Sequence, residues 1–239
     1  MKNYGIPKLD TPVYILKLPS TQEDIKYRPF LVKEQKLLMM AQESGEDTDL
    51  VNIITDIIKS CTFDKIDVNT VPLFDIEYMF LKLRAKSVGE TATIRVLCPD
   101  DGKTYVNVNV NIDELEVQMI EDHSNIIELT DKIKMIMKYP QLKDMRGLQS
   151  ISTSQTEQIF SILKHCISEV HEGETIYNRV DVTDKDIEDF IESFSTEQLK
   201  SIMNFFETMP KIRKVVNVTN PKTKVESEII LEGMETFLE

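Results

Sequence analysis

Residues 72–115 read PLFDIEYMFLKLRAKSVGETATIRVLCPDDGKTYVNVNVNIDEL, and they set the plan of this chain of 239 residues. The first part predicts a helix over 76–86 with Asp75 as its N-cap, and the glycine that follows predicts its end. Two strands, 91–97 and 104–112, then flank a Pro-Asp-Asp-Gly turn, and valine alternates with asparagine along the second strand. Such alternation is typical of a strand with one buried face. The stretch therefore predicts a helix followed by a β-hairpin.

A second helix-plus-hairpin unit is expected near the C-terminus. Residues 195–209 have a helical pattern, and strands are expected at 212–218 and 225–231, on either side of a turn that begins Asn220-Pro221. Cys98-Pro99 and Asn220-Pro221 hold equivalent places in the two hairpins, which favours a repeated unit. The same order of elements also arises by chance in unrelated α+β chains, so this alternative stays open.

The remaining patterns predict short strands and amphipathic helices. They comprise a hairpin of 13–18 and 25–32, helices 33–44 and 48–61, strands within 124–140, a short helix from Gln141, a helix from Thr153-Ser154 through His171, an extended segment 175–182, and helices capped by Thr183 and Ser195. We therefore expect an α+β fold in which β-hairpins combine with helical pairs. We divide it into an N-terminal α+β region, 1–140, and a mostly helical region, 141–239, closed by a C-terminal hairpin.

The composition indicates a folded, acidic protein. Apolar residues make up 41% of the chain, which suffices for a buried core. Lys and Arg number 28 against 41 Asp and Glu, a net charge of −13 without a basic cluster, so we expect no nucleic-acid binding. Three widely separated cysteines predict reduced thiols in a cytoplasm. No apolar run reaches the roughly 18 to 20 residues of a membrane helix, so we expect no membrane span.

Two longer phrases carry a family resemblance. The first is PVYILKLPST…IKYRPFLVKEQKLLMMAQES, within 12–44, where a strand pair leads into a helix through RPFLVKE. The second is DVNTVPLFDIEYMFLKLRAKSVGE, 67–90, which is followed by a Cys-Pro turn and by MKYP at 137–140. In this order the phrases resemble the T4-type bacteriophage baseplate hub and hub-assembly proteins. The C-terminal half matches that pattern less closely.

The resemblance implies a non-enzymatic structural component of the baseplate hub of a contractile-tail phage. Such a late virion protein acts by protein–protein binding during tail assembly. The resemblance also implies that its partners are other baseplate hub or tail proteins and that it needs no cofactor. It would lie in the virion tail and, during assembly, in the host cytoplasm. The alternative within the family is a hub-assembly chaperone that is absent from the finished virion. The resemblance leaves the oligomeric state open.

The residues themselves predict no catalytic, cofactor-binding or metal site. Cys98, in the turn CPDDGK, resembles half of a zinc-ribbon knuckle, but a structural zinc needs four N or S ligands. The second turn offers Asn220 and no cysteine. Ordinary turn chemistry is thus the favoured explanation, and a metal-binding module of degenerate zinc-ribbon type is the alternative from another functional class.

The three histidines and the methionines each allow a structural and a functional explanation. His123 is expected to be a solvated loop residue, with an unrecognised hydrolase built on 121–124 as the alternative. His165 and His171 are expected on opposite sides of one helix, where they cannot share a metal. The methionines are expected to fill a core, with an adaptable binding surface as the alternative. Helix 33–44 is expected to bury one apolar face, which consists of Leu37, Leu38, Met40 and Ala41.

Overall fold

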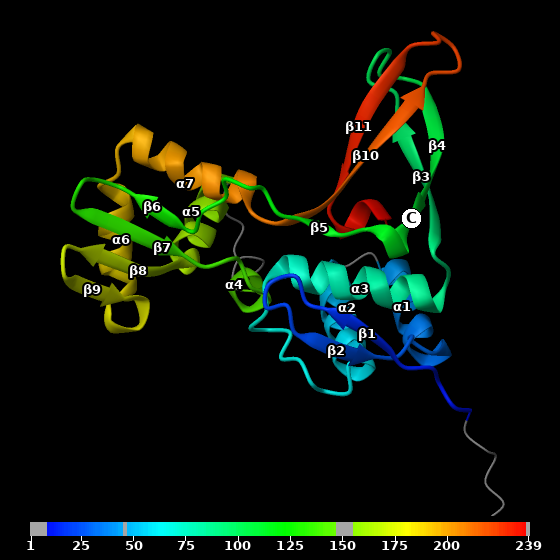
Figure 1. Cartoon of the computed structure of the whole chain (residues 1–239), viewed down its shortest axis with the longest axis horizontal. Helices are drawn as coiled ribbons and strands as arrows, with labels where there is room; N and C mark the ends of the chain where they lie inside the picture. Colours follow the sequence, from blue (N-terminus) through cyan, green and yellow to red (C-terminus); the bar gives the residue numbers. More distant parts are fainter. Residues whose placement is uncertain (1–8, 45–46, 147–154, 238–239) are drawn as a thin grey trace, which may run out of the picture. The chain divides into compact units, whose positions relative to one another are not determined.

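The structure is a computed structural model that describes residues 9–44, 47–146 and 155–237 (Figure 1). Helices and strands follow one another as β1 Tyr14–Lys17, β2 Asp24–Tyr27, α1 Val32–Ser44, α2 Asp47–Cys61, α3 Leu73–Ser87, β3 Thr91–Leu97, β4 Tyr105–Asn111, β5 Val117–Gln118, β6 Ile126–Glu128, β7 Ile133–Met137, α4 Leu142–Arg146, α5 Gln155–Cys166, β8 Ile167–Glu172, β9 Thr175–Asn178, α6 Asp184–Glu192, α7 Thr196–Thr208, β10 Lys211–Thr219 and β11 Glu226–Glu232. Single 3-10 turns lie at Ile112–Glu114, Arg179–Asp181 and Met234–Phe237. Helices combined with small antiparallel sheets confirm the predicted α+β class.

Two compact units make up the chain. Unit 1 comprises residues 1–68, 75–115 and 214–239, and unit 2 comprises 69–74 and 116–213. The units are thus interleaved along the sequence, and the division of the chain at residue 140 stays a prediction. The order helix, strand, strand does occur twice, as α3-β3-β4 and α7-β10-β11. That these are copies of one another also stays a prediction.

Unit 1 has its core around α2 and α3. The apolar side of α2 is fully buried at Ile57 and Ile58. Helix α3 is apolar over most of its circumference, as predicted, and it buries Ile76, Met79, Phe80, Leu81, Leu83 and Ala85. Burial of each large apolar side chain contributes roughly 1.5–3 kcal/mol relative to an exposed position. The prediction for α1 was wrong in part, because Leu37 and Met40 are 44% and 54% exposed.

The start of α3 also differs from the prediction. The helix begins at Leu73, so Asp75 lies inside its first turn and is not the N-cap. The helix thus begins three residues earlier than predicted, and the Leu73 amide, a helix-terminal donor, is satisfied by the Pro140 carbonyl at 3.0 Å. The fully buried Asp75 carboxylate instead accepts hydrogen bonds from the amide and the hydroxyl of Ser20.

The β3–β4 hairpin of unit 1 has the predicted alternation. Strand β3 pairs with β4 from Thr91↔Asn111 to Leu97↔Tyr105. Alternate residues of β3 are buried, and the asparagines of β4 lie on the other side of the ladder from its valines. Strand β10 is hydrogen-bonded to β11, and its first two residues pair with β5 in unit 2. The C-terminal 3-10 turn buries Phe237 completely.

Unit 2 is a four-stranded antiparallel sheet, in the order β6-β7-β8-β9, with α5, α6 and α7 packed on one face (Figure 1). The buried residues that join the sheet to these helices are Ile127, Leu129, Met135, Met137, Leu163, Cys166, Ile167, Ile187, Ile191, Ile202 and Phe205. Met135 and Met137 therefore fill the core, as predicted. The caps predicted at Thr183 and Ser195 are also confirmed, and each forms a capping box, at the start of α6 and α7 respectively.

The predicted helix through His171 is wrong in its last five residues. Helix α5 ends at Cys166, and β8 begins at the next residue. Its predicted cap at 153–154 lies outside the described residues. β8 pairs with β7 through Met135↔Val170 and Met137↔Ile167. Ile167 and Val170 continue the apolar helical spacing of α5, but both are β-branched and pair in the sheet, and this pairing overrides the local periodicity.

No helix in the described part of the chain is long and apolar enough to cross a membrane.

Candidate functional site

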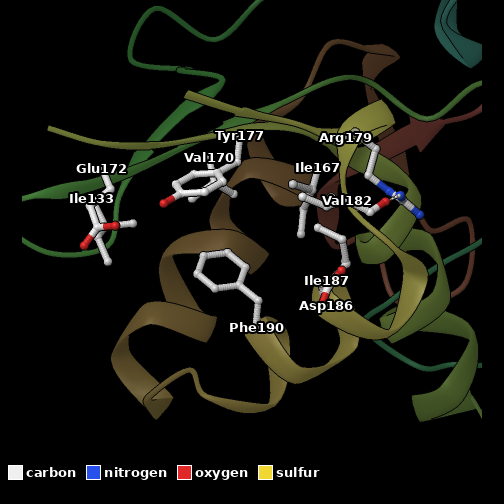
Figure 2. Close-up of a pocket in the computed structure, with 10 residues that line it drawn as sticks. All are labelled: Ile133, Ile167, Val170, Glu172, Tyr177, Arg179, Val182, Asp186, Ile187 and Phe190. Atoms are coloured by element: carbon white, nitrogen blue, oxygen red, sulfur yellow. Dashed lines mark hydrogen bonds between the residues drawn. The ribbon is translucent and has the colours of Figure 1, made fainter. Parts of the chain in front are cut away.

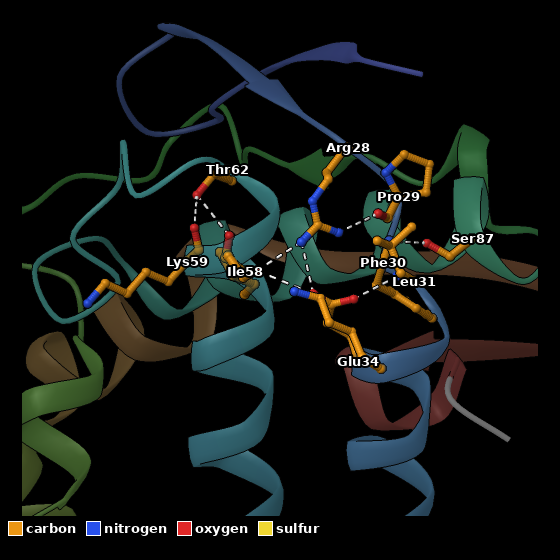
Figure 3. Close-up of polar contacts among 11 residues, drawn as sticks. Arg28, Pro29, Phe30, Leu31, Glu34, Ile58, Lys59, Thr62 and Ser87 are labelled. Carbon is orange, nitrogen blue, oxygen red and sulfur yellow. Dashed lines mark hydrogen bonds and ion pairs between the residues drawn. The ribbon is translucent and has the colours of Figure 1, made fainter. Parts of the chain in front are cut away.

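The RPFLVKE segment forms a buried polar cluster in unit 1 (Figure 3). Arg28 donates to Glu34 at 2.8 Å, to the Ser60 hydroxyl at 2.9 Å and to the Pro29 carbonyl at 2.9 Å. The other carboxylate oxygen of Glu34 accepts the Leu31 amide at 2.8 Å, which satisfies a free donor at the start of α1. The segment thus ties β2, α1 and α2 together.

The electrostatics of this cluster favour a fixed ion pair. Burial alone raises the pKa of Glu34, but the hydrogen bonds from Arg28, the Leu31 amide and Lys33 outweigh it and lower the pKa to about 2. The side chains of Arg28 and Glu34 are 11% and 5% exposed. Both charges are therefore already satisfied inside the fold and are not presented to a substrate.

The LRAKSVGE phrase contacts the same cluster. The Ser87 hydroxyl accepts the Phe30 amide at 2.9 Å, across 57 residues of sequence. The neighbouring Lys86 bridges Glu90 at 2.7 Å and Asp113 at 2.8 Å. The two phrases that carry the family resemblance thus build one framework, a connection that neither phrase signals by itself.

The two hairpin turns of unit 1 meet through hydrogen bonds. Asn220, which is 1% exposed, donates to both carboxylate oxygens of Asp100 at 3.0 Å. The Thr223 hydroxyl donates to the same carboxylate, and together these bonds lower the pKa of Asp100. Asp101 turns back on its own hairpin, where it accepts both the amide and the hydroxyl of Thr104.

The described residues at these two turns do not supply a set of metal ligands. Cys98 is fully buried, and its amide and carbonyl bond to Thr104 and Gly102 across the turn. Among the residues that the structure describes, no three His, Cys, Asp or Glu side chains are grouped so that they could hold a metal ion. The two turns are instead joined by the hydrogen bonds of Asn220 and Thr223 to Asp100.

The three cysteine thiols are buried, and burial favours their protonated, unreactive form. Burial raises the pKa of Cys61 to about 11 and that of Cys166 to about 12. Burial also raises the pKa of the Cys98 thiol, and Asp100 and Asp101 raise it further. A nucleophilic cysteine needs the opposite shift.

His123 is packed into unit 2, so its expected place in a solvated loop was wrong. Its ring lies 5.6 Å from that of Tyr139 and 5.2 Å from that of Phe205. Nε2 lies 3.0 Å from the Tyr139 hydroxyl, and Nδ1 lies 2.9 Å from the Thr208 hydroxyl. Because Thr208 donates to the Asn204 carbonyl, Nδ1 carries the proton and Nε2 accepts from Tyr139. Burial lowers the pKa of His123, which favours this neutral form.

Ser124, the hydroxyl of the hydrolase alternative at 121–124, bonds to the backbone next to it. The Ser124 hydroxyl contacts the Ile126 backbone, at 3.1 Å from its amide. His171 lies on β8, not on a helix with His165, and its Nε2 contacts Glu169 at 2.7 Å.

An apolar pocket of about 310 Å³ opens in unit 2 between the sheet and α6 (Figure 2). Tyr177 of β9 and Phe190 of α6 lie on opposite sides of its opening. The remaining lining residues are Ile133, Ile167, Val170, Glu172, Arg179, Val182, Asp186 and Ile187. Sequence reasoning missed the pocket, because it forms where β9 extends beyond the helix layer and no local pattern marks that place.

Comparison with known families completes the description. A family model described as T4 bacteriophage base plate protein matches residues 11–239. No curated protein and no solved structure matches the chain. The match covers both resembling phrases, both compact units and the C-terminal hairpin, and hence nearly the whole chain. The chain therefore belongs to the T4 bacteriophage base plate protein family, which indicates a place in the phage tail.

Proposed function

We propose that this chain is a non-enzymatic component of the baseplate hub of a contractile-tail phage, and that it acts by binding other hub or tail proteins during assembly. The observation that carries the proposal is the family match over residues 11–239. A baseplate component needs to bind other proteins, because its contacts with them fix the geometry of the baseplate. The proposal includes folding in the host cytoplasm before incorporation.

The interior of the fold supports a binding role rather than a catalytic one. Arg28 and Glu34, the two buried charged residues of the RPFLVKE phrase, are paired with each other. Both ring nitrogens of His123 have hydroxyl partners. Exposed apolar side chains, in contrast, remain on α1, where Met39 and Met40 are each 54% exposed. Methionine suits an adaptable contact surface.

The test is a phage that lacks the gene, grown with and without the chain supplied in trans. Without it, we expect baseplate particles that lack central density in electron micrographs and that sediment as incomplete structures. The folded variants His123→Gln and Cys98→Ser should restore assembly as well as the wild-type chain. If either variant folds normally and yet fails to complement, the binding mechanism is wrong and chemistry must be sought at that residue.

The second candidate within the family is an assembly chaperone, which would be needed for hub formation and absent from virions. A metal-dependent binding module is the candidate from another class. Metal analysis of the purified chain decides that question, since a zinc-dependent module requires close to one zinc per chain. We expect far less than one, because Asp100 and Asn220 already hold the two turns together.

A further inference from the structure

We infer that β9 and the neighbouring apolar pocket of unit 2 form a docking site for an extended, basic segment of another baseplate protein. The inference rests on the proposed function, since it names the surface through which part of that binding occurs. It goes beyond that function by assigning the site and the chemistry of the partner segment.

Strand β9 offers an unoccupied edge. Its only ladder partner among the described residues is β8, with pairs from Glu169↔Asn178 to Glu172↔Thr175. All four residues of β9 are exposed, including Ile176 at 54% and Tyr177 at 44%. The outward amide and carbonyl groups of such an edge can pair with another extended chain, which is the usual basis of strand addition.

The pocket lies on the helix-covered face of that same edge. Met135, Val170 and Tyr177 form one row across β7, β8 and β9. Along this row the side chains change from fully buried at Met135 to partly buried at Val170 and exposed at Tyr177. The helix layer therefore stops short of the sheet edge. Figure 2 shows the resulting opening between Tyr177 and Phe190.

A strand added beside β9 would turn alternate side chains toward this opening, because side chains alternate along a strand. The pocket volume of about 310 Å³ is large enough for one bulky side chain and is bounded mainly by aliphatic and aromatic groups. The partner segment should therefore carry one large apolar residue, such as Phe, Leu or Met, between residues of high β-propensity. Main-chain pairing would supply affinity, and the pocket would supply specificity.

The charge around the site selects a basic partner. The segment from Glu172 to Asp189 holds seven acidic residues and two basic ones. Of the two basic residues, Arg179 is paired with Asp184. Lys164 of α5 pairs with Glu188 and offsets one further charge, and the Gly173 amide donates to the Lys132 carbonyl, so one more basic residue lies next to the segment. This field attracts Lys and Arg that flank the anchoring residue. It also opposes pairing of β9 with β9 of a second copy, which would bring two acidic segments together.

The experiment uses the full-length chain and overlapping peptides of about 12 residues that span the other baseplate proteins of the same phage, a length that covers an added strand and its flanks. Binding is measured by fluorescence anisotropy, and amide hydrogen exchange locates it. We expect binding peptides to share one bulky apolar residue flanked by Lys or Arg. They should slow exchange at residues 175–178.

Matched variants separate the pocket from the rest of the surface. Val182→Phe and Val170→Phe add volume inside the pocket and should weaken peptide binding about tenfold or more, the effect of blocking an anchor. Two variants are used because either one could disturb the fold, which thermal unfolding would reveal. Ile176→Ala changes the opposite face of β9, since Ile176 pairs with His171, and should bind as wild type.

Charge reversal gives an independent measurement. Glu172→Lys at the pocket should reduce the association rate about fivefold at low salt, and the reduction should fade as salt is added. Glu228→Lys on the exposed side of β11 in unit 1 applies the same charge change away from the site and should leave the rate unchanged.

Besides the absence of any binding peptide, three results would overturn the inference. One is equal peptide binding by wild type and by well-folded pocket-filled variants. Another is binding that leaves exchange at β9 unchanged. The third is a concentration-dependent dimer that pocket filling abolishes, which would assign the site to a second copy. If no peptide binds while the chain still completes baseplates in trans, the inference fails and the proposed function stands. If the chain is not required for baseplates, the proposed function itself fails.

Discussion

At Glu34 one carboxylate serves two parts of the fold. One oxygen accepts the Leu31 amide at the start of α1, and the other accepts Arg28. The helix-start role can be read from sequence, because Glu is favoured at the third helical position, where it reaches back to the N-cap amide. The pairing with Arg28 and Ser60 cannot be predicted from sequence, because α2 approaches this point only in the folded chain.

The variant Glu34→Gln should lower the free energy of unfolding by about 3 kcal/mol, the cost of leaving a buried charge without its partner. Urea unfolding at neutral pH measures the change. Glu43→Gln, at an exposed position of the same helix, is the matched control and should stay within about 0.5 kcal/mol of wild type. A loss below about 1 kcal/mol for Glu34→Gln would show that Arg28 is satisfied without this carboxylate.

Acid unfolding checks the same pair by a second route. The folded pKa of Glu34 is about 2, against 4.5 as the ordinary value. Its stabilisation is thus present above pH 4.5 and is lost as the pH falls from 4.5 through 2. The wild-type chain should lose stability across this window, and Glu34→Gln should lose less.

His123 predicts a pH dependence in a different window. Its folded pKa lies below the ordinary 6.5 because the ring is buried, so the unfolded chain takes up a proton first as the pH falls. The contribution of His123 to stability is therefore complete above pH 6.5 and declines as the pH drops from 6.5 toward the folded pKa.

Comparison of wild type with His123→Phe by urea unfolding at several pH values between 7.5 and 5 measures this dependence. Toward pH 5, the free energy of unfolding of the wild type should fall more steeply than that of His123→Phe. Ile176→Ala, which changes no titratable group, serves as the control and should keep the wild-type slope. Parallel slopes for wild type and His123→Phe would mean that His123 titrates equally in the folded and unfolded chains.

Among the elements, those with local signals were predicted well. The β3–β4 hairpin follows from period-2 alternation around a Gly turn, and α6 and α7 follow from their capping residues. The failures lie where tertiary contacts override local patterns. Helix α5 passes directly into β8 because β7 and β9 accept the segment as a strand. The sequence around Asp75 predicts an N-cap, yet its carboxylate accepts hydrogen bonds from Ser20.

The contact between the hairpin turns gives a prediction at the scale of elements. Asn220→Ala removes two donors from Asp100 and the acceptor of the Lys222 amide. Asn220 is buried, but Asp100 and Lys222 are exposed and can turn to water, so we expect a loss of about 1 kcal/mol in unfolding free energy. Asn109→Ala, on the exposed face of β4, is the control and should cost less than about 0.5 kcal/mol. Amide exchange near residues 98–104 should also speed up in Asn220→Ala alone, and unchanged exchange there would contradict the contact.

The whole molecule could be predicted only in class and family. The α+β class follows from the mixture of periodicities, and the resemblance of residues 12–140 is confirmed by a family match that extends from 11 to 239. The composition of the two units could not be predicted, because unit 1 combines three separate segments of the chain. The pocket beside β9 depends on how far the helices reach across the sheet, and no local pattern specifies that extent.

Quantitative mass spectrometry of purified virions tests the central claim most directly. A hub component is retained in the particle, so we predict this chain at a few copies per virion, at a constant ratio to the other baseplate proteins. Infected-cell extract from the same culture is the control that shows the chain is made and detectable. Abundance in that extract together with absence from purified virions would contradict a structural role and would identify the chain as an assembly factor.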